Sequence, residues 1–371
     1  MEGRSGNCPA QDLYTYDIAS LEAGDIILST TAGKQSAWIR TATGSDFSHA
    51  MLYTNKTIVH AAGPGVFTIN PQRQLFSLGQ SVVLRVRQPH DCDLVKVCNY
   101  ALAQGGALYT IPEAVLAVAM QATGQRALSP SQYCSRLVAQ AYQSAGLKLV
   151  ANADFCVPGQ FLHSPALREV DGAVRLADSN EFQVGQTPDT LQVHQEHTFA
   201  WLEPARRLAK ESKGVTISTI LDALEFVRAN RQYDDAICRY VEKSGYLDDA
   251  ELDRQVNPHR YDADAFRSWV TSRRQPVEAV FQGELDIARD VAQNALRNWK
   301  AVAPVSLRLH QLLAKTHWRR LALVKSRLEL IRMLCIEFGE SGCEALARQK
   351  LRDLDSVLAE GYPSSPAYSL L

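Results

Sequence analysis

The apolar residues of this chain follow two different periods, and the change near residue 200 limits the folds available to it. Before that point, short β-branched runs are separated by glycine, asparagine and proline, which predicts a small sheet. The runs are DIILS (25–29), HAMLY (49–53), TIVHA (57–61) and SVVLRVR (81–87). Helical spacing occurs only in pieces, around 91–104, 111–122 and 130–145. The first part is therefore expected to be α+β.

From about residue 205 onward the apolar residues recur at helical spacing, as at Leu321, Val324 and Leu328, which predicts an all-α bundle. Charged residues rise from 29 in residues 1–200 to 50 in the remaining 171. Residues 171–200 are polar and weakly periodic, which is typical of a linker. We expect one domain at 1–200, with a linker from about 171, and a helical domain of unknown role at 201–371.

Composition excludes several classes of function. A net charge of −1 provides no global basic field for nucleic acid. No apolar run is long enough to span a bilayer, and the first residues lack the features of a secretory signal. Eight cysteines without a CxxC pair argue against a disulfide framework or a zinc site. We expect a cytoplasmic protein without metal or cofactor, with export by a signal-independent route left open.

One helix has marked ends. In LSPSQYCSRLVAQAYQSAG (128–146), Ser129 is the expected N-cap, Pro130 the first helical residue and Gly146 the terminator, and Gln132 completes a capping box. Cys134 would then lie about one turn from the N-terminus, where backbone N–H groups favour a thiolate. The alternative is that Cys134 is an ordinary small buried residue.

Two histidines flank a predicted hairpin. Asn55 and Lys56 join the two strand-like runs, and a two-residue loop there would set Thr54 opposite Thr57. That register makes His49 and His60 diagonal neighbours on one face of the sheet. A three-residue loop would place them on opposite faces.

A nucleophilic thiol needs a base, and the base needs a third group that fixes its ring. Cys134, His49 and His60 supply these three groups if the helix start faces the hairpin. The alternative for either histidine taken singly is a structural role with satisfied hydrogen bonds.

Five motifs resemble one family in content and order. They are GDIIL (24–28), FSHAMLY (47–53), IVHA (58–61), YCSRLV (133–138) and VPGQFLHSP (157–165). Residues 20–170 resemble the circularly permuted papain-like hydrolases, the YiiX/YaeF-like relatives of NlpC-type peptidases and of lecithin:retinol acyltransferase. The resemblance implies a permuted papain-like fold, in which a small antiparallel sheet packs on the Cys-bearing helix.

By the same resemblance Cys134 is the nucleophile, His49 the base and His60 the third polar residue, acting through an acyl-enzyme intermediate. Ser48 and Tyr133 are expected to line the substrate site. Asp25 is a further candidate for substrate binding, although an acid at a strand start or turn is the plainer interpretation.

Three functions follow. The first is a cysteine hydrolase of an amide, such as a cell-wall peptide, or of a lipid acyl ester. The second is a phospholipid-directed acyltransferase or phospholipase with the same intermediate. The third is a non-catalytic interaction protein with a relic papain-like domain.

Three other sequence features give weaker support for a functional role. Gly106-Ala-Leu-Tyr109-Thr110 lacks the acid that relatives tend to have after tyrosine, which weakens a role for Tyr109. His194 and His197 invite a metal site but lie in the polar linker without companion ligands. The basic amphipathic stretch 316–332 fits a protein partner or a membrane surface, and it also fits a bundle helix with a solvated face.

Overall fold

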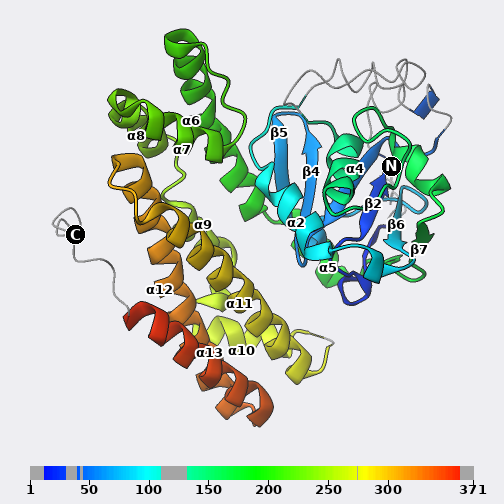
Figure 1. The fold of residues 1–371 in the computed structure, drawn as a ribbon. Helices are drawn as coiled ribbons and strands as arrows, with labels where there is room; N and C mark the ends of the chain where they lie inside the picture. The colour runs from blue at the N-terminus through cyan, green and yellow to red at the C-terminus, as the bar shows by residue number, and fades with distance from the viewer. Residues whose placement is uncertain (1–11, 31–39, 42–44, 110–131, 274, 360–371) are drawn as a thin grey trace, which may run out of the picture. The chain divides into compact units, whose positions relative to one another are not determined.

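The computed structural model describes residues 12–30, 40–41, 45–109, 132–273 and 275–359. The chain divides after Ala223 into two compact units, each with its own hydrophobic core (Figure 1). The first unit is α+β and the second is helical, which confirms the predicted fold class.

The main sheet of the first unit is antiparallel and has the strand order β5-β4-β3-β2-β6-β7. Its strands are β2 (Ile26–Ser29), β3 (His49–Tyr53), β4 (Ile58–Ala62), β5 (Gly65–Ile69), β6 (Ser81–Val86) and β7 (Leu167–Glu169). A second sheet pairs β1 (Tyr14–Tyr16) with β8 (Val174–Leu176). The four predicted strands correspond to β2, β3, β4 and β6.

The side chains of the main sheet alternate between two apolar layers, as a strand period of two requires. Helices α2 (Leu94–Ala103) and α4 (Cys134–Ser144) cross one face, where Ala50 and Leu52 pack against the buried side of α4 (Figure 1). Met51 and Tyr53, one position along on β3, point to the opposite face and its separate core.

The predicted hairpin is confirmed. The amide of Thr54 donates to the carbonyl of Thr57 over 2.8 Å, so the loop contains two residues. Asn55 and Lys56 both adopt positive φ, 55° and 82°, as a tight turn that matches strand twist requires.

The start of α4 was predicted wrongly. The helix begins at Cys134, not before it, and Tyr133 is the extended N-cap residue. The cause is non-local: the amide of Gln132 donates to the carbonyl of Leu108 over 2.8 Å, which keeps the chain extended up to Tyr133. Ser129, Pro130 and the helical piece expected at 111–122 lie outside the described residues. The helix ends as predicted, with Gly146 at φ 91°.

Residues 171–200, interpreted from their polarity as a linker, are folded. They contain β8, α5 (Ser179–Gln186) and the first part of α6 (Thr190–Lys213). Asp178 and Glu181 form a capping box at the start of α5, and Asp189 caps α6. Their apolar periodicity is weak because α5 buries no residue completely.

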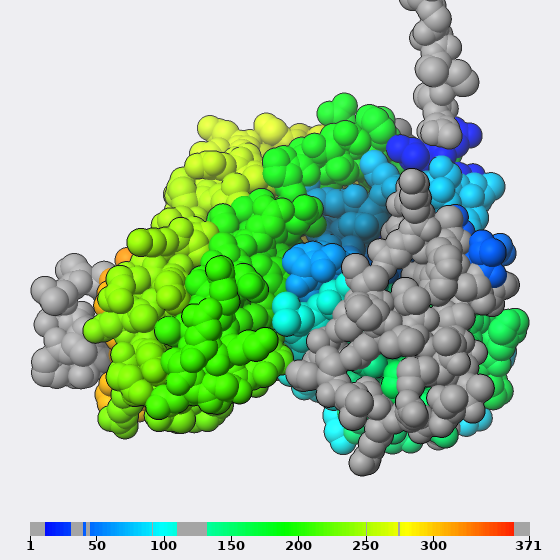
Figure 2. Space-filling model, turned by 90° about the horizontal axis from the view of Figure 1, so that it is seen from above, coloured from blue at the N-terminus to red at the C-terminus, as the bar shows by residue number. Residues whose placement is uncertain are grey.

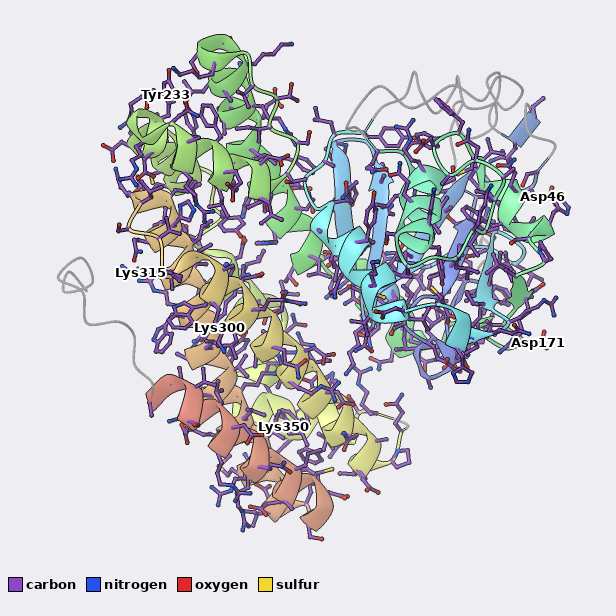
Figure 3. All side chains as sticks on the ribbon, viewed as in Figure 1. Asp46, Asp171, Tyr233, Lys300, Lys315 and Lys350 are labelled. Atoms are coloured by element: carbon purple, nitrogen blue, oxygen red, sulfur yellow. The ribbon has the colours of Figure 1, made fainter. Side chains whose placement is uncertain are left out.

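The second unit contains the predicted bundle. Its helices are α8 (Asp234–Lys243), α9 (Asp249–Val256), α10 (Ala263–Thr271), α11 (Val277–Val302), α12 (Arg308–Glu337) and α13 (Ser341–Ala359), and α7 (Ile220–Ala229) spans the division. Tyr233, labelled in Figure 3, stacks on Phe226 with ring centroids 5.6 Å apart. The stretch 316–332 lies inside α12, where Leu321, Val324 and Leu328 are buried in the bundle core. In the described part of the chain, no helix is both long enough and apolar enough to cross a membrane.

Short 3-10 helices connect these elements. They are η1 (Ile18–Ser20), η2 (Pro71–Arg73), η3 (Pro89–Asp91), η4 (Pro158–His163), η5 (Arg231–Tyr233) and η6 (Pro258–Arg260).

Candidate active site

The β3–β4 hairpin opens at the end that carries the histidines. Pairing between the two strands stops at Leu52 and Val59. On their outer sides both strands stay paired further, β3 with β2 as far as His49 and β4 with β5 as far as Ala62. The sheet therefore contains a gap between β3 and β4, bounded by the two histidine-bearing segments.

The two histidines meet as the register predicted. Nε2 of His49 lies 2.8 Å from Nδ1 of His60, so one hydrogen is shared between the rings. The His60 ring also makes an edge contact with Phe67 of β5, at 4.2 Å between centroids. Burial lowers the pKa of His49 to about 4 and also lowers the pKa of His60, so both rings are neutral at pH 7.

The Cys134 sulfur lies at the gap between the strands. The amide of Tyr53 donates to the carbonyl of Asp25, toward β2, so by alternation the amide of Ala50 points toward β4 and into the gap. A hydrogen bond from this Ala50 amide lowers the pKa of the Cys134 thiol, which places the sulfur within its reach. The thiol therefore lies close to the backbone of Ala50, the residue that follows His49.

The net electrostatic effect on this thiol differs from the sequence-based expectation. The amides of Ala50, Cys134 and Ser135 all favour the thiolate, as a helix N-terminus should. Burial opposes them and is the largest effect, so the pKa of Cys134 is raised. The thiol of Cys134 and the imidazoles of His49 and His60 are therefore all neutral at pH 7.

The contact between the two rings occupies one nitrogen of His49. Since Nε2 of His49 faces His60, Nδ1 is the ring nitrogen that remains for another partner. No direct hydrogen bond joins the sulfur of Cys134 to His49, both of which belong to the described residues. Such bonds are often long in a ligand-free enzyme and shorten when substrate binds.

The other predicted site residues divide into two groups. Ser48 is buried next to His49, and its amide donates to the carbonyl of Ser29 over 3.1 Å. Tyr133 directly precedes Cys134, and its hydroxyl donates to the carbonyl of Asp154 over 2.7 Å. Both lie beside the centre, and a role in substrate binding stays a prediction.

Asp25 is not brought to the centre. Its carboxylate is completely buried and bound by Arg85, with Nε 2.7 Å from Oδ1. It precedes β2, whereas His49 pairs with Ser29 at the other end of that strand. These contacts fit the interpretation of Asp25 as a strand-start acid.

Sequence reasoning missed or discounted three neighbours of the thiol. The charge of a Cys134 thiolate raises the pKa of Tyr109 and contributes to the raised pKa of Cys156, so both lie close to it. Ser135 follows the cysteine in the chain, and its buried hydroxyl donates to the carbonyl of Cys156 over 2.7 Å. Ser135 had a sequence signal as a polar residue beside the candidate nucleophile, and Tyr109 had one in the motif at 106–110, where the missing acid led us to discount it.

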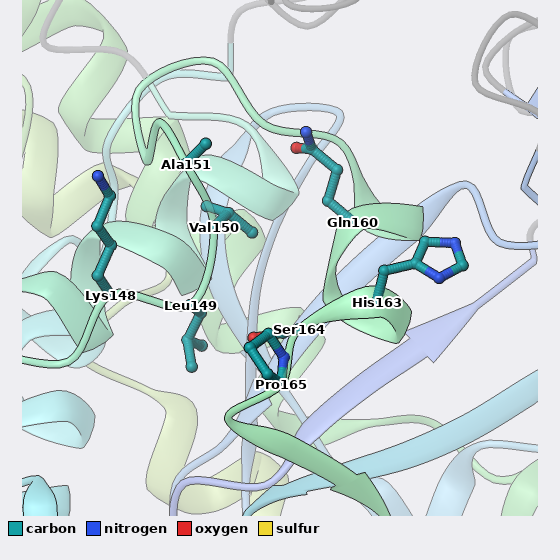
Figure 4. Close-up of a pocket in the computed structure, with 8 residues that line it drawn as sticks. All are labelled: Lys148, Leu149, Val150, Ala151, Gln160, His163, Ser164 and Pro165. Carbon is teal, nitrogen blue, oxygen red and sulfur yellow. The ribbon is translucent and has the colours of Figure 1, made fainter.

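A surface pocket of about 440 Å³ lies elsewhere in this unit, between the chain after α4 and η4 (Figure 4). Its lining includes Lys148, Val150, Gln160 and Ser164, but none of Cys134, His49 and His60. His194 and His197 lie on α6, and the described part of the chain holds no group of three or more residues suited to a metal ion.

Comparison with known proteins gives little beyond this geometry. No family model matches the chain, and no curated protein does. Among solved structures, the chain is similar to the crystal structure of metalloprotein yiiX from Escherichia coli O157:H7, DUF1105. The identity is 21%, the match covers 41% of this chain and 97% of that one, and the TM-score is 0.29.

Proposed function

We propose that this protein is a cysteine-dependent acyl hydrolase of the permuted papain-like type, with Cys134 as nucleophile, His49 as base and His60 as the group that orients the base. One observation carries the proposal. The Cys134 sulfur is within reach of the Ala50 amide, at the strand gap bounded by two hydrogen-bonded histidines.

In the proposed first step, the proton of the Cys134 thiol passes to Nδ1 of His49 while the sulfur attacks an acyl carbonyl carbon. The imidazolium then gives that proton to the departing amine or alcohol, which leaves a thioester on Cys134. Water, deprotonated by His49, attacks the thioester and releases the acid and the free thiol. Backbone amides at the helix start supply hydrogen bonds for the negative charge that develops on oxygen.

The direct test is to trap the thioester. The protein would be mixed with p-nitrophenyl butyrate, quenched in acid, and digested so that mass spectrometry identifies the acylated residue. We expect a butyryl group on Cys134, and a rate of nitrophenol release that falls by at least about 100-fold in Cys134→Ala and in His49→Ala.

Cys98→Ala is the matched control, because Cys98 is a partly exposed cysteine on α2. In this variant, p-nitrophenyl butyrate should acylate Cys134 at the wild-type rate. Acylation of other cysteines alone, with Cys134 unmodified, would favour a non-catalytic interaction protein.

Acyl transfer uses the same thioester and differs in the group that resolves it. Adding an amine or alcohol acceptor to the trapped enzyme distinguishes the two, since a transferase forms the amide or ester faster than the free acid. Matched peptide amides and phospholipid esters, supplied as alternative substrates, would then define the substrate class.

A further inference from the structure

Tyr133, the residue that precedes the candidate nucleophile, is the N-cap of α4. Its backbone is extended, with φ −137° and ψ 165°, and its side chain makes no capping hydrogen bond to the helix. The residues that favour this position, such as serine and aspartate, place a side-chain oxygen against an amide of the first turn. Tyr133 does not supply that oxygen, so a requirement other than capping must explain its side chain.

The Tyr133 side chain binds the backbone of the segment 154–156 instead. Its hydroxyl donates to the carbonyl of Asp154 over 2.7 Å and accepts from the amide of Cys156 over 3.1 Å. The residue is only 1% exposed, and the single proton of its hydroxyl goes to this backbone. These two bonds tie the residue before the nucleophile to a segment that begins 21 residues further along the chain.

Two further side chains from the first turn of α4 bind the same segment. The Ser135 hydroxyl donates to the carbonyl of Cys156 over 2.7 Å, and Nε of Arg136 donates to the carbonyl of Asp154 over 2.9 Å. Cys134 therefore lies between two chain neighbours whose side chains are both fixed to one short stretch of backbone.

We propose that Tyr133 is a positioning residue, which holds the extended backbone before Cys134 so that α4 begins at the nucleophile and the sulfur keeps one place relative to His49. Ser135 completes the hold from the other side. The proposal rests on the proposed function of Cys134, and Tyr133 acts through that residue without touching the substrate. Reacting groups need such fixing, because a displacement of about 1 Å can slow a reaction about 100-fold.

The choice of tyrosine at this position also fits the proposed chemistry. A serine at the N-cap would set an acceptor oxygen against the amide of Ser135 or Arg136. The proposed mechanism uses backbone amides at this helix start for the negative charge that develops on the substrate oxygen. Because the Tyr133 hydroxyl is bound to the segment 154–156, the tyrosine holds the backbone without competing for those amides.

The test compares wild type, Tyr133→Phe and Ser135→Ala in single-turnover acylation by p-nitrophenyl butyrate. Tyr133→Phe keeps the ring and removes two hydrogen bonds to the segment, whereas Ser135→Ala removes one. We expect the maximal acylation rate to fall by about 10- to 100-fold in Tyr133→Phe and by less in Ser135→Ala. The half-saturating ester concentration should stay within about twofold of wild type, since positioning affects the rate and not substrate binding.

Tyr142→Phe is the matched control. It removes a buried hydroxyl of the same helix that also donates to a backbone carbonyl, that of Gly24. It should lower the melting temperature by a few degrees, as Tyr133→Phe does, and leave the maximal acylation rate unchanged.

Two results would overturn the proposal. A wild-type maximal rate in folded Tyr133→Phe would make the hydroxyl purely structural, and a raised half-saturating concentration at an unchanged rate would make it a substrate contact. If melting curves show that Tyr133→Phe does not fold, an unchanged rate in Ser135→Ala overturns the proposal in its place. Failure of wild-type Cys134 to acylate would reject the proposed function and this proposal with it, whereas the other results reject the role of Tyr133 alone.

Discussion

The proposed role of His49 requires one particular tautomer of each histidine in the pair. For Nδ1 of His49 to accept the thiol proton, Nε2 must carry the ring hydrogen and donate to Nδ1 of His60. His60 then carries its hydrogen on Nε2, a buried atom with no partner among the described residues. In this tautomer one buried ring nitrogen lacks a hydrogen bond among the described residues, which is a departure from the usual pairing of buried polar groups.

His60→Asn should preserve part of this arrangement, because its amide oxygen can accept from Nε2 of His49. We expect it to retain more acylation activity than His60→Leu, which should lose about 10- to 100-fold. The loss should fall on the acylation rate and not on substrate binding, since His60 acts through His49. Pre-steady-state kinetics with p-nitrophenyl butyrate would separate the two effects, and equal activity in both variants would leave His60 a structural residue.

The lowered pKa of His49 predicts how stability depends on pH. Between about pH 6.5 and pH 4 the unfolded chain binds a proton at this residue and the native protein does not. Stability therefore falls as pH falls through this window, by on the order of 1 to 3 kcal/mol from His49 alone. Urea unfolding at pH 7 and pH 4.5 would show a smaller fall in His49→Gln than in wild type. The same fall in both would mean that His49 is not buried in its neutral form.

At the scale of elements, a buried arginine of α6 bonds this helix to other segments of the first unit. Arg206 is 8% exposed and donates to the carbonyls of Gly106, Ile217 and Ser218. Phe199, on the same helix, lies against Gly65 at the start of β5. In Figure 2 the green surface of α6 adjoins cyan surface of the first unit. Arg206 binds the segment around Gly106. This segment leads to Tyr109, so α6 helps to position a neighbour of the thiol.

Replacing Arg206 by leucine should leave three backbone carbonyls without their donor. We expect a loss of about 2 to 4 kcal/mol in the free energy of unfolding, and slower acylation of Cys134 because the 104–109 segment loosens. Arg207→Leu is the control, since Arg207 is the exposed neighbour on the same helix and should change stability by less than about 0.5 kcal/mol. Urea denaturation of both variants makes the comparison, and equal losses would show that the buried contacts contribute nothing specific.

At the scale of the whole molecule, the second unit has a hydrophobic core separate from that of the first unit. Glu284 of α11 is buried with Arg327 of α12, and Nε of Arg260 lies 3.3 Å from its carboxylate. These two arginines hold the pKa of Glu284 well below its usual range. Removal of the acid would leave buried cations without their counter-charge.

Glu284→Gln should therefore destabilise the second unit by about 3 to 5 kcal/mol. Because the two units have separate cores, we expect an early unfolding transition of the helical unit while Cys134 still acylates. Glu278→Gln, at an exposed position of the same helix, is the control. Calorimetry combined with acylation at each temperature makes the test. Loss of acylation together with the early transition would show that the two units unfold as one.

The sequence by itself determined what depends on short-range geometry. The turn at Asn55 and Lys56 set the register that brings His49 and His60 together, and strand and helix periods identified the α+β unit and the bundle. Chain order and residue type were enough to select Cys134 as the candidate nucleophile.

Tertiary structure decided what depends on distant contacts. The gap between β3 and β4, the extended backbone at Gln132 and the folding of residues 171–200 all result from pairing or packing with segments far along the chain. The thiol itself is the clearest case. A helix start favours its ionisation, but complete burial opposes it more strongly, and desolvation is a property of everything packed around the sulfur.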